Sequence, residues 1–331
     1  MCLSTGFAGQ SCRGRRSLEA GIAIVVSVKS LEEILSKLGL RPSLAERYEK
    51  IATKIDPHDL QRSGSTSQEL ALTEEDLLGD LTGERYQSRR IFDFYTEAGF
   101  EFALERYGLL AQIRELGFRD LRFAYDLDDP KRQHIACFGT KGDGEHLLID
   151  LMMGRIRISA PPGLEPAQPP LELLSIEWMM LQNPTETFAP DHPRWPGQEH
   201  PGLGLNHEIM LLHIQSAKRL GLDGVVNHPS RYHVAFLGRD RIYFLDPEIQ
   251  GRFDALREAL GDLDLTDATW RMERGEVRWA DDDSAVEWHP RDYVLPLSQR
   301  LVDYFESTTY QEPRTESYLA SLHRGIRLVD S

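Results

Sequence analysis

Cysteine, long apolar runs and positive charge are all scarce in this sequence. Its three cysteines, Cys2, Cys12 and Cys137, are widely spaced, which argues against a disulfide framework or a CxxC metal site and fits a reducing cytoplasm. The apolar run AGIAIVVSV reaches only about nine residues, whereas a transmembrane helix needs about 20. With 38 basic and 53 acidic residues, the net charge is −15, which argues against the basic surface that nucleic acids or anionic membranes require and leaves a local basic groove open. We therefore expect a soluble, acidic, cytoplasmic protein that binds neither.

The histidines do not follow a familiar metal-binding pattern. HEIMLLH places two of them six residues apart, on different faces of a helix, whereas the zinc motif HExxH needs a spacing of about four. We therefore predict no metal ligands. An alternative hypothesis is a metal enzyme in which the loop before residue 202 brings His192, His200 and His207 together with Glu199 or Glu208.

The N-terminal third has a helical pattern. Residues 1–28 are rich in Gly, Ser and Arg, which predicts a disordered leader, although their apolar end also fits an edge strand or an export signal. Residues 29–117 show helical periodicity, as in SLEEILSKLGL and PSLAERYEKIATKI, and Gly99 and Gly108 are candidate breaks. Six aromatic residues could line a pocket, but their spacing favours a helical core: Phe92, Phe94, Tyr95, Phe100, Phe102 and Tyr107.

From residue 118 the apolar period shortens toward that of a strand. LRFAYDL, RQHIACFGT and HLLIDLMMGRIRIS, joined by turns rich in Asp, Pro and Gly, predict an antiparallel meander. Leu171 to Leu181 is expected to be a strand that is buried on both faces near its centre. A Pro-rich loop follows, then a helix over 205–220, a strand at Gly224–Asn227, a short helix, a strand and a helix capped by Asp246.

The last seventy residues have a different pattern. ATWRMERGEVRWA predicts a hairpin, and helices are expected over 290–306 and 316–327. The predicted fold class is α+β, with a mostly antiparallel mixed sheet flanked by helices. The predicted organisation is a leader (1–28), a helical region (29–117), a sheet-containing core (118–262) and a C-terminal hairpin with helices (263–331).

Gly202 and Gly204 open the helix that begins near residue 205. Glycine allows positive φ and close approach of a ligand, and the free N–H groups of a helix N-terminus attract anions. This turn is not a Walker loop, because GxxxxGK[ST] is absent, and GxGxxG fails at its third glycine. GxSxG is also absent, which argues against a serine hydrolase.

The order of these elements resembles that of the GNAT-type N-acetyltransferases. The resemblance runs from about Leu121 to Leu245 and consists of meander strands, a buried strand, a Gly-x-Gly turn that opens a helix, a strand, a short helix and a final strand. In that family the turn holds the pyrophosphate of acetyl-CoA and the preceding strand pairs with the pantetheine arm. The resemblance therefore implies a GNAT-like core.

By this resemblance the protein is an acyl-CoA-dependent N-acyltransferase. Acetyl-CoA or another acyl-CoA would be the co-substrate, and the acceptor would be an amine of a small molecule or peptide. Glu177 on the buried strand is the expected base, and Tyr232 and His233 are the expected acids. Contacts to the acyl-CoA are expected at Leu181, Gly202, Leu203, Gly204, Leu205, Asn206 and His207.

A non-catalytic interaction protein with the same fold is the main alternative. The family has Gln or Arg three residues before the first glycine of its turn, where this sequence has Glu199 or Pro201, depending on the register. A carboxylate there would repel a pyrophosphate. Three tryptophans of the C-terminal part, Trp270, Trp279 and Trp288, would mark an interface, or else pack in the interior. Assembly into a homo-oligomer is left open.

Overall fold

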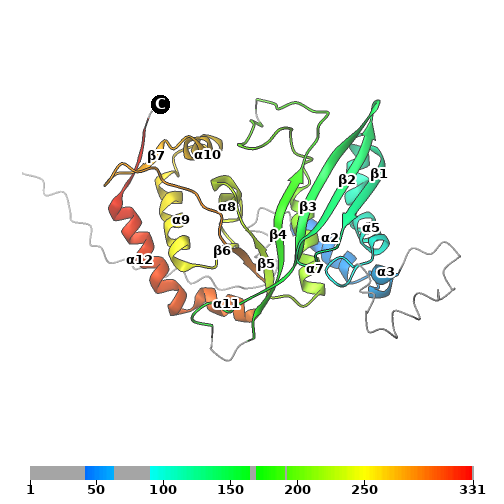
Figure 1. Cartoon of the computed structure of the whole chain (residues 1–331), viewed down its shortest axis with the longest axis horizontal. Coiled ribbons are helices and arrows are strands. Elements are labelled where there is room, and N and C mark those ends of the chain that lie inside the picture. The colour runs from blue at the N-terminus through cyan, green and yellow to red at the C-terminus, as the bar shows by residue number, and fades with distance from the viewer. Residues whose placement is uncertain (1–41, 63–89, 165–168, 191, 330–331) are drawn as a thin grey trace, which may run out of the picture.

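A seven-stranded sheet with the strand order β1-β2-β3-β4-β5-β8-β6 forms the centre of the protein (Figure 1). The computed structural model describes residues 42–62, 90–164, 169–190 and 192–329. The leader and the helix expected in SLEEILSKLGL lie outside these residues. Helices flank the sheet and all but one of its strand pairs are antiparallel, so the expected α+β class with a mostly antiparallel sheet is confirmed.

The first four strands form the predicted antiparallel meander. Alternating apolar residues and short turns determine its register, and Gly142 adopts a φ of +64° in the turn between the second and third strands. These strands are β1 (Arg119–Asp126), β2 (Gln133–Lys141), β3 (Gly144–Ile158) and β4 (Leu171–Leu181).

The chain then crosses over and returns parallel to β4. Helix α7 (Asn206–Arg219) leads into strand β5 (Gly224–Asn227), which pairs in parallel with β4. Leu173 and Leu174 point to opposite faces, and both are fully buried. Strands covered on both faces read as continuous apolar runs, and this explains why the predicted central strand and the short strand at Gly224–Asn227 are both correct.

Strand β8 (Tyr293–Pro296) lies between β5 and β6 (Tyr243–Phe244). The expectation of one helix from residue 290 to 306 is wrong here, because only its second half is helical, as α11 (Gln299–Glu306). A proline inside a helix removes a hydrogen bond and clashes with the preceding turn. Pro296 therefore disfavours a helix over this part of the segment, and it is the last residue of the strand. The predicted boundary at residue 262 therefore divides the sheet.

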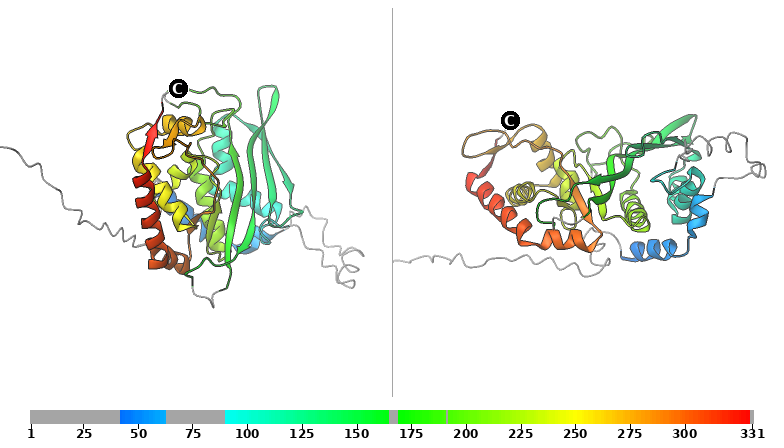
Figure 2. Two further views of the ribbon diagram at one scale, coloured as in Figure 1. Left: turned by 60° about the vertical axis from the view of Figure 1, so that its left-hand side comes forward. Right: turned by 60° about the horizontal axis from the view of Figure 1, so that its bottom comes forward.

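One face of β1–β4 is covered by helices from the N-terminal region together with α7 (Figure 2). Gly108 adopts a φ of +84° and separates two of these helices, as predicted, whereas Gly99 lies inside a helix. A Cβ at Gly99 would lie 2.0 Å from the carbonyl oxygen of Leu60, so glycine permits a close approach between two helices. The helices are α2 (Pro42–Ala52), α3 (Pro57–Gln61), α5 (Glu97–Tyr107) and α6 (Leu109–Glu115).

The predicted hairpin over residues 268–280 is wrong. Asp264 caps a helix there by accepting a hydrogen bond from the Thr266 N–H, and Ala268 and Met272 form its buried face. Only the last part of the segment is a strand, and it pairs with a strand at the end of the chain. The elements are α10 (Leu265–Glu273), β7 (Val277–Trp279), α12 (Thr308–Arg324) and β9 (Ile326–Leu328).

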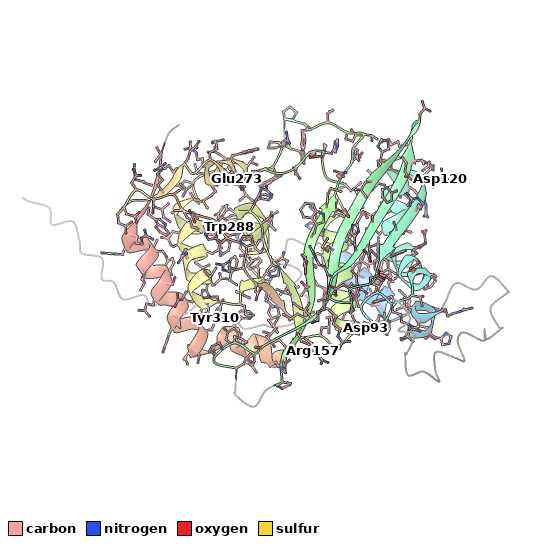
Figure 3. All side chains as sticks on the ribbon, in the orientation of Figure 1. Asp93, Asp120, Arg157, Glu273, Trp288 and Tyr310 are labelled. Carbon is pink, nitrogen blue, oxygen red and sulfur yellow. The ribbon has the colours of Figure 1, made fainter. Side chains whose placement is uncertain are left out.

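Two short-range predictions in the second half of the chain are confirmed. Helix α8 (Tyr232–Gly238) follows β5, and helix α9 (Pro247–Ala259) begins at Asp246, whose carboxylate accepts hydrogen bonds from two backbone N–H groups. Trp288, labelled in Figure 3, packs edge-on against Tyr232 of α8 and near Phe253 of α9. This part of the molecule is therefore built around a buried aromatic cluster.

Candidate functional site

The β4–α7–β5 crossover brings the Gly-x-Gly turn to one edge of the sheet. Strands β4 and β5 run parallel, so the helix between them runs back and begins near the carboxyl end of β4. Ligands of open sheets commonly bind beyond the carboxyl ends of parallel strands. A Cβ on Gly202 would lie 3.6 Å from the carbonyl oxygen of Leu181, which places the turn beside the last residue of β4.

The two parallel strands separate at this edge. Their pairing runs from Leu173–Gly224 to Ile176–Asn227 and stops, although β4 continues to Leu181. We call this region the fork and define it as residues 177–181 of β4 with Asn227 and His228. Within the described ranges no strand pairs with the β5 side of residues 177–181.

A β-bulge explains why β4 turns away from β5. Met152 pairs with Trp178 and Met153 pairs with Ile176, so Glu177 is an extra residue on β4. A bulge bends its strand and increases the local twist. The bulge coincides with the last β4–β5 pair, and the strand after it is exposed: Trp178 and Met179 are 50% and 39% exposed.

The glycine turn has a rigid, apolar base and an open front. Leu203 and Leu205 are buried, at 5% and 3% exposure. Between them Gly204 is exposed and adopts a φ of +74°, with no atom within 4 Å of where its Cβ would be. Asn206 and His207, which begin α7, are exposed. The turn thus presents backbone rather than side chains to an incoming ligand.

The first turn of α7 offers unoccupied N–H groups. Leu205 occupies the N-cap position and makes no side-chain hydrogen bond to the helix, so the N–H groups of that turn lack the usual capping oxygen. Glu208 lies in the same turn and faces α2, where its charge contributes to raising the pKa of Tyr48, after burial as the main cause. The helix end can therefore receive an anion at its exposed front.

Glu177, the expected base, lies at the bulge. Its carboxylate accepts a hydrogen bond of 2.8 Å from the guanidinium of Arg132, and both side chains are largely solvent-exposed. An exposed ion pair of this kind is weak and easily rearranged. Glu177 can therefore exchange Arg132 for another partner at the fork.

Tyr232, the first of the expected acids, lies in the aromatic cluster. It is 2% exposed and its ring contacts Phe236, Phe253 and Trp288. Burial raises the pKa of its hydroxyl well above the usual range. This position gives Tyr232 a packing role and holds its hydroxyl in the protonated form.

His233, the second expected acid, lies against the loop that precedes the glycine turn. Its ring centroid is 4.5 Å from that of Trp195. Burial, assisted by the charge of Arg231, lowers its pKa to about 4. The imidazole is therefore neutral near pH 7, and its buried Nδ1 has no hydrogen-bond partner in the described part of the chain.

His228 and Asp292 form a pair at the fork that sequence reasoning did not assign to the site. The Nε2 of His228, directly after β5, is 2.8 Å from a carboxylate oxygen of Asp292, directly before β8. The hydrogen bond to Asp292 raises the pKa of His228, and Glu177 adds a smaller effect in the same direction. The same hydrogen bond lowers the pKa of Asp292. The fork thus holds a histidine oriented by a carboxylate, an arrangement suited to proton transfer.

A signal for His228 was present in the sequence, but none was present for its partner. His228 directly follows a short predicted strand, whereas Asp292 belongs to a segment that was expected to be helical. Next to His228, the Oδ1 of Asn227 is buried and lacks a hydrogen-bond partner from any described residue. The base of the fork therefore has an unused acceptor.

Neither a cluster of metal ligands nor a membrane-spanning helix occurs among the described residues. Across residues 42–62, 90–164, 169–190 and 192–329, no three His, Cys, Asp or Glu side chains gather as metal ligands would. Within the same ranges, every helix is too short or too polar to cross a bilayer. Cys137 is fully buried, and burial raises the pKa of its thiol to about 12.

Comparison with known proteins leaves the fork and the turn as the basis for any functional assignment. No protein-family model matches the chain, and neither a curated protein nor a solved structure matches it significantly.

Proposed function

We propose that this protein is an acyl-CoA-dependent N-acyltransferase with a GNAT-like core. The observation that carries the proposal is the fork: a bulged strand separates from its parallel neighbour beside a glycine turn that opens a helix. An extended thioester can lie against such a free strand edge, with its phosphates at the helix N-terminus. The resemblance in element order to GNAT-type enzymes points to the same chemistry.

The backbone from Gly202 to His207 would hold the pyrophosphate of the acyl-CoA. Gly204 keeps the turn open, and the uncapped first turn of α7 supplies N–H donors. The pantetheine arm would add to the free edge of β4 as far as Leu181. The thioester carbonyl would then reach the bulge at Glu177, where backbone N–H groups outside the regular ladder can polarise it.

Groups at the fork would carry out the proton transfer. The amine nitrogen attacks the thioester carbonyl carbon, the C–S bond breaks, and the amine proton is passed on while the thiolate is protonated. Glu177 and His228 are the groups placed to accept the amine proton, with Asp292 orienting His228. His233 is neutral near pH 7, so the thiolate would take its proton from solvent. The amine would belong to a small molecule or peptide in the cytoplasm.

Acetyl-CoA binding tests the proposal directly. At a concentration of 100 times Kd, a ligand that binds only the folded state stabilises it by about 2.7 kcal/mol, so millimolar acetyl-CoA should raise Tm. Gly204→Ala should weaken this effect, because an L-residue at positive φ strains the turn. Gly221→Ala is the matched control: Gly221 has a φ of +66° and equally open surroundings, but follows the opposite end of α7.

Both variants should lose similar stability without ligand, and only Gly204→Ala should lose the response to acetyl-CoA. Absence of any shift with acetyl-CoA and with longer acyl-CoAs would contradict the proposal. Release of free CoA thiol in the presence of an amine panel would then establish turnover.

A non-catalytic acyl-CoA-binding or interaction protein is the second candidate. One feature favours it: the stretch from Glu199 to Glu208 contains two acidic residues and no Lys or Arg. The two candidates differ in turnover, because a binding protein would show the Tm shift without thiol release.

A further inference from the structure

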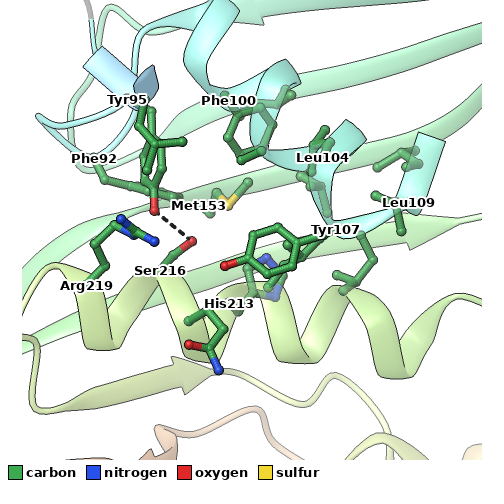
Figure 4. A pocket seen from close by; sticks show the side chains of 18 of the residues that line it. Phe92, Tyr95, Phe100, Leu104, Tyr107, Leu109, Met153, His213, Ser216 and Arg219 are labelled. Atoms are coloured by element: carbon green, nitrogen blue, oxygen red, sulfur yellow. Dashed lines mark hydrogen bonds between the residues drawn. The ribbon is translucent and has the colours of Figure 1, made fainter. Parts of the chain in front are cut away.

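An apolar cavity lies between the sheet and the helices that cover its first half. Its volume is about 40 Å³, and its walls come from α5, α6, α7 and strands β1–β3 (Figure 4). Phe92, Phe100, Leu104 and Met153 form much of the apolar lining. Four of the six aromatic residues noted in the N-terminal sequence thus line this cavity, namely Phe92, Tyr95, Phe100 and Tyr107.

Polar groups gather at one end of this cavity. The Tyr95 hydroxyl lies 3.4 Å from the Ser216 hydroxyl, and Figure 4 shows Arg219 and the Tyr107 hydroxyl beside this pair. Burial raises the pKa of both tyrosines, and the charge of Arg219 opposes that rise. An apolar cavity with a few convergent polar groups is the usual form of a small-molecule site.

Arg219 brings a positive charge to this end of the cavity. Its guanidinium donates a hydrogen bond of 2.9 Å to the backbone carbonyl of Ala52. None of the ion pairs formed among the described residues includes Arg219. A cation in such surroundings is stabilised by an anion that completes its hydrogen bonds.

His213 supplies a second, independent sign that this cavity binds a ligand. It lines the cavity and is 5% exposed, yet its Nδ1 is buried without a hydrogen-bond partner in the described parts of the chain. Burial lowers its pKa to about 4, so the ring is neutral near pH 7. Buried polar atoms are almost always paired with protein, water or ligand.

The backbone of the cavity wall is strained at Phe92. Phe92 and the adjacent Asp93 adopt φ values of +57° and +58°, which are costly for residues with a side chain. The Phe92 N–H donates to the side-chain oxygen of Gln133, which holds the turn in place. Strain of this kind is common where a site is preformed.

We propose that this cavity binds a short-chain aliphatic carboxylate, with the carboxylate at Arg219 and the chain against Phe100, Leu104 and Met153. The cavity volume limits the length of the ligand's carbon chain, because a cavity of 40 Å³ takes about three groups the size of water. Butyrate, with three carbons beyond its carboxylate carbon, matches this. The polar end of the cavity is distant from the glycine turn: Arg219 ends α7, whereas the turn precedes that helix. At a rise of about 1.5 Å per residue, Arg219 and the turn are about 20 Å apart.

Titration calorimetry with the full chain tests the proposal. Acetate, propionate, butyrate, hexanoate and benzoate are compared with butyramide, which has the shape of butyrate without its charge. Butyrate should bind most tightly, and butyramide at least about tenfold more weakly, because hydrogen bonds to charged groups are the stronger ones. No binding of any carboxylate at tens of millimolar, or equal binding of butyramide, would overturn the proposal.

Three variants make the test specific. Arg219→Gln should weaken butyrate binding about tenfold or more, whereas Lys218→Gln, which removes the neighbouring positive charge outside the cavity, should not. Leu104→Ala enlarges the cavity and should move the preference from butyrate toward hexanoate. Unchanged chain-length preference in Leu104→Ala, or unchanged affinity in Arg219→Gln, would place the bound carboxylate elsewhere and refute the site. The comparison of butyrate with butyramide needs no variant.

Discussion

His228 and Asp292 control each other's charge at the fork. Their side chains are 2.8 Å apart, although 64 positions separate them in the sequence. The pKa of His228 is raised from its ordinary value of 6.5 and that of Asp292 is lowered from 3.8. Between these ordinary values both groups are charged, so the pair stabilises the fold most in this pH window. Its contribution is lost as pH rises through the raised pKa of His228, or falls through the lowered pKa of Asp292.

Replacing Asp292 by asparagine should lower the pKa of His228. The amide removes the carboxylate that stabilises the imidazolium, so the histidine should lose its proton at a lower pH. NMR titration of the His228 ring measures this directly. Because the pair is partly exposed, the loss in unfolding free energy should be only about 0.5–1 kcal/mol.

Glu287→Gln is the control for this measurement, since Glu287 pairs with the exposed His289 at 3.1 Å. It should leave the titration of His228 unchanged. If Asp292→Asn leaves that titration unchanged as well, Asp292 does not orient or charge His228, and its place in the proposed site is lost.

At the scale of elements, two helices approach so closely at Gly99 that no room is left for a side chain at this position. Gly99 lies in α5, and its missing Cβ leaves room for the backbone of Leu60 at the end of α3. Thr96 caps α5 and accepts a hydrogen bond from the N–H of Gly99. The backbone N–H of Thr96 in turn donates to the carbonyl of Leu60. This contact positions the aromatic face of α5 over the sheet and so shapes the cavity.

Gly99→Ala should destabilise the protein, although alanine normally strengthens a helix. The added methyl carbon would lie 2.0 Å from a backbone oxygen, so α3 and α5 must separate, at a cost of about 1–3 kcal/mol. Urea unfolding measures the change. Ala98→Gly, at the exposed neighbouring position, gives the helix-propensity effect alone, about 1 kcal/mol. A gain in stability for Gly99→Ala would show that α3 does not pack there.

At the scale of the whole molecule, one sheet combines strands from residue 119 to residue 296. Strand β8 lies between β5 and β6, and its residues Tyr293 and Val294 are fully buried. On one face Val294 packs with Leu173, Val226 and Leu301, and on the other face Tyr293 belongs to the larger apolar cluster. The C-terminal segment is therefore part of the main fold.

A chain that ends at residue 262 should not fold. Without β8, the partner strands β5 and β6 lose their shared hydrogen bonds and expose buried apolar surface. Circular dichroism should show no cooperative thermal transition. A chain that ends at residue 325 is the control, because it loses β9 and keeps β8, and it should still unfold cooperatively. Cooperative unfolding of the shorter chain would show that the first 262 residues are a domain of their own.

Short stretches of the sequence were enough to predict many of the helices and strands. Apolar periods, caps and glycines act over a few residues, so β1–β4, β5, α7, α8 and α9 could be predicted from short windows. The glycine turn that opens α7 followed from the same local patterns. The predictions failed where a four-residue run, Tyr293–Pro296, became a strand only through its partners.

Contacts between residues that are distant in the sequence could be seen only in the folded structure. The place of β8 in the sheet, the separation of β4 from β5 after Ile176 and the pairing of His228 with Asp292 all depend on strand pairing between remote segments. The cavity likewise needs α5, α7 and three strands at once. The physical reason is that contact energies between distant segments add only when the chain is folded, and a local sequence pattern carries no record of its partner.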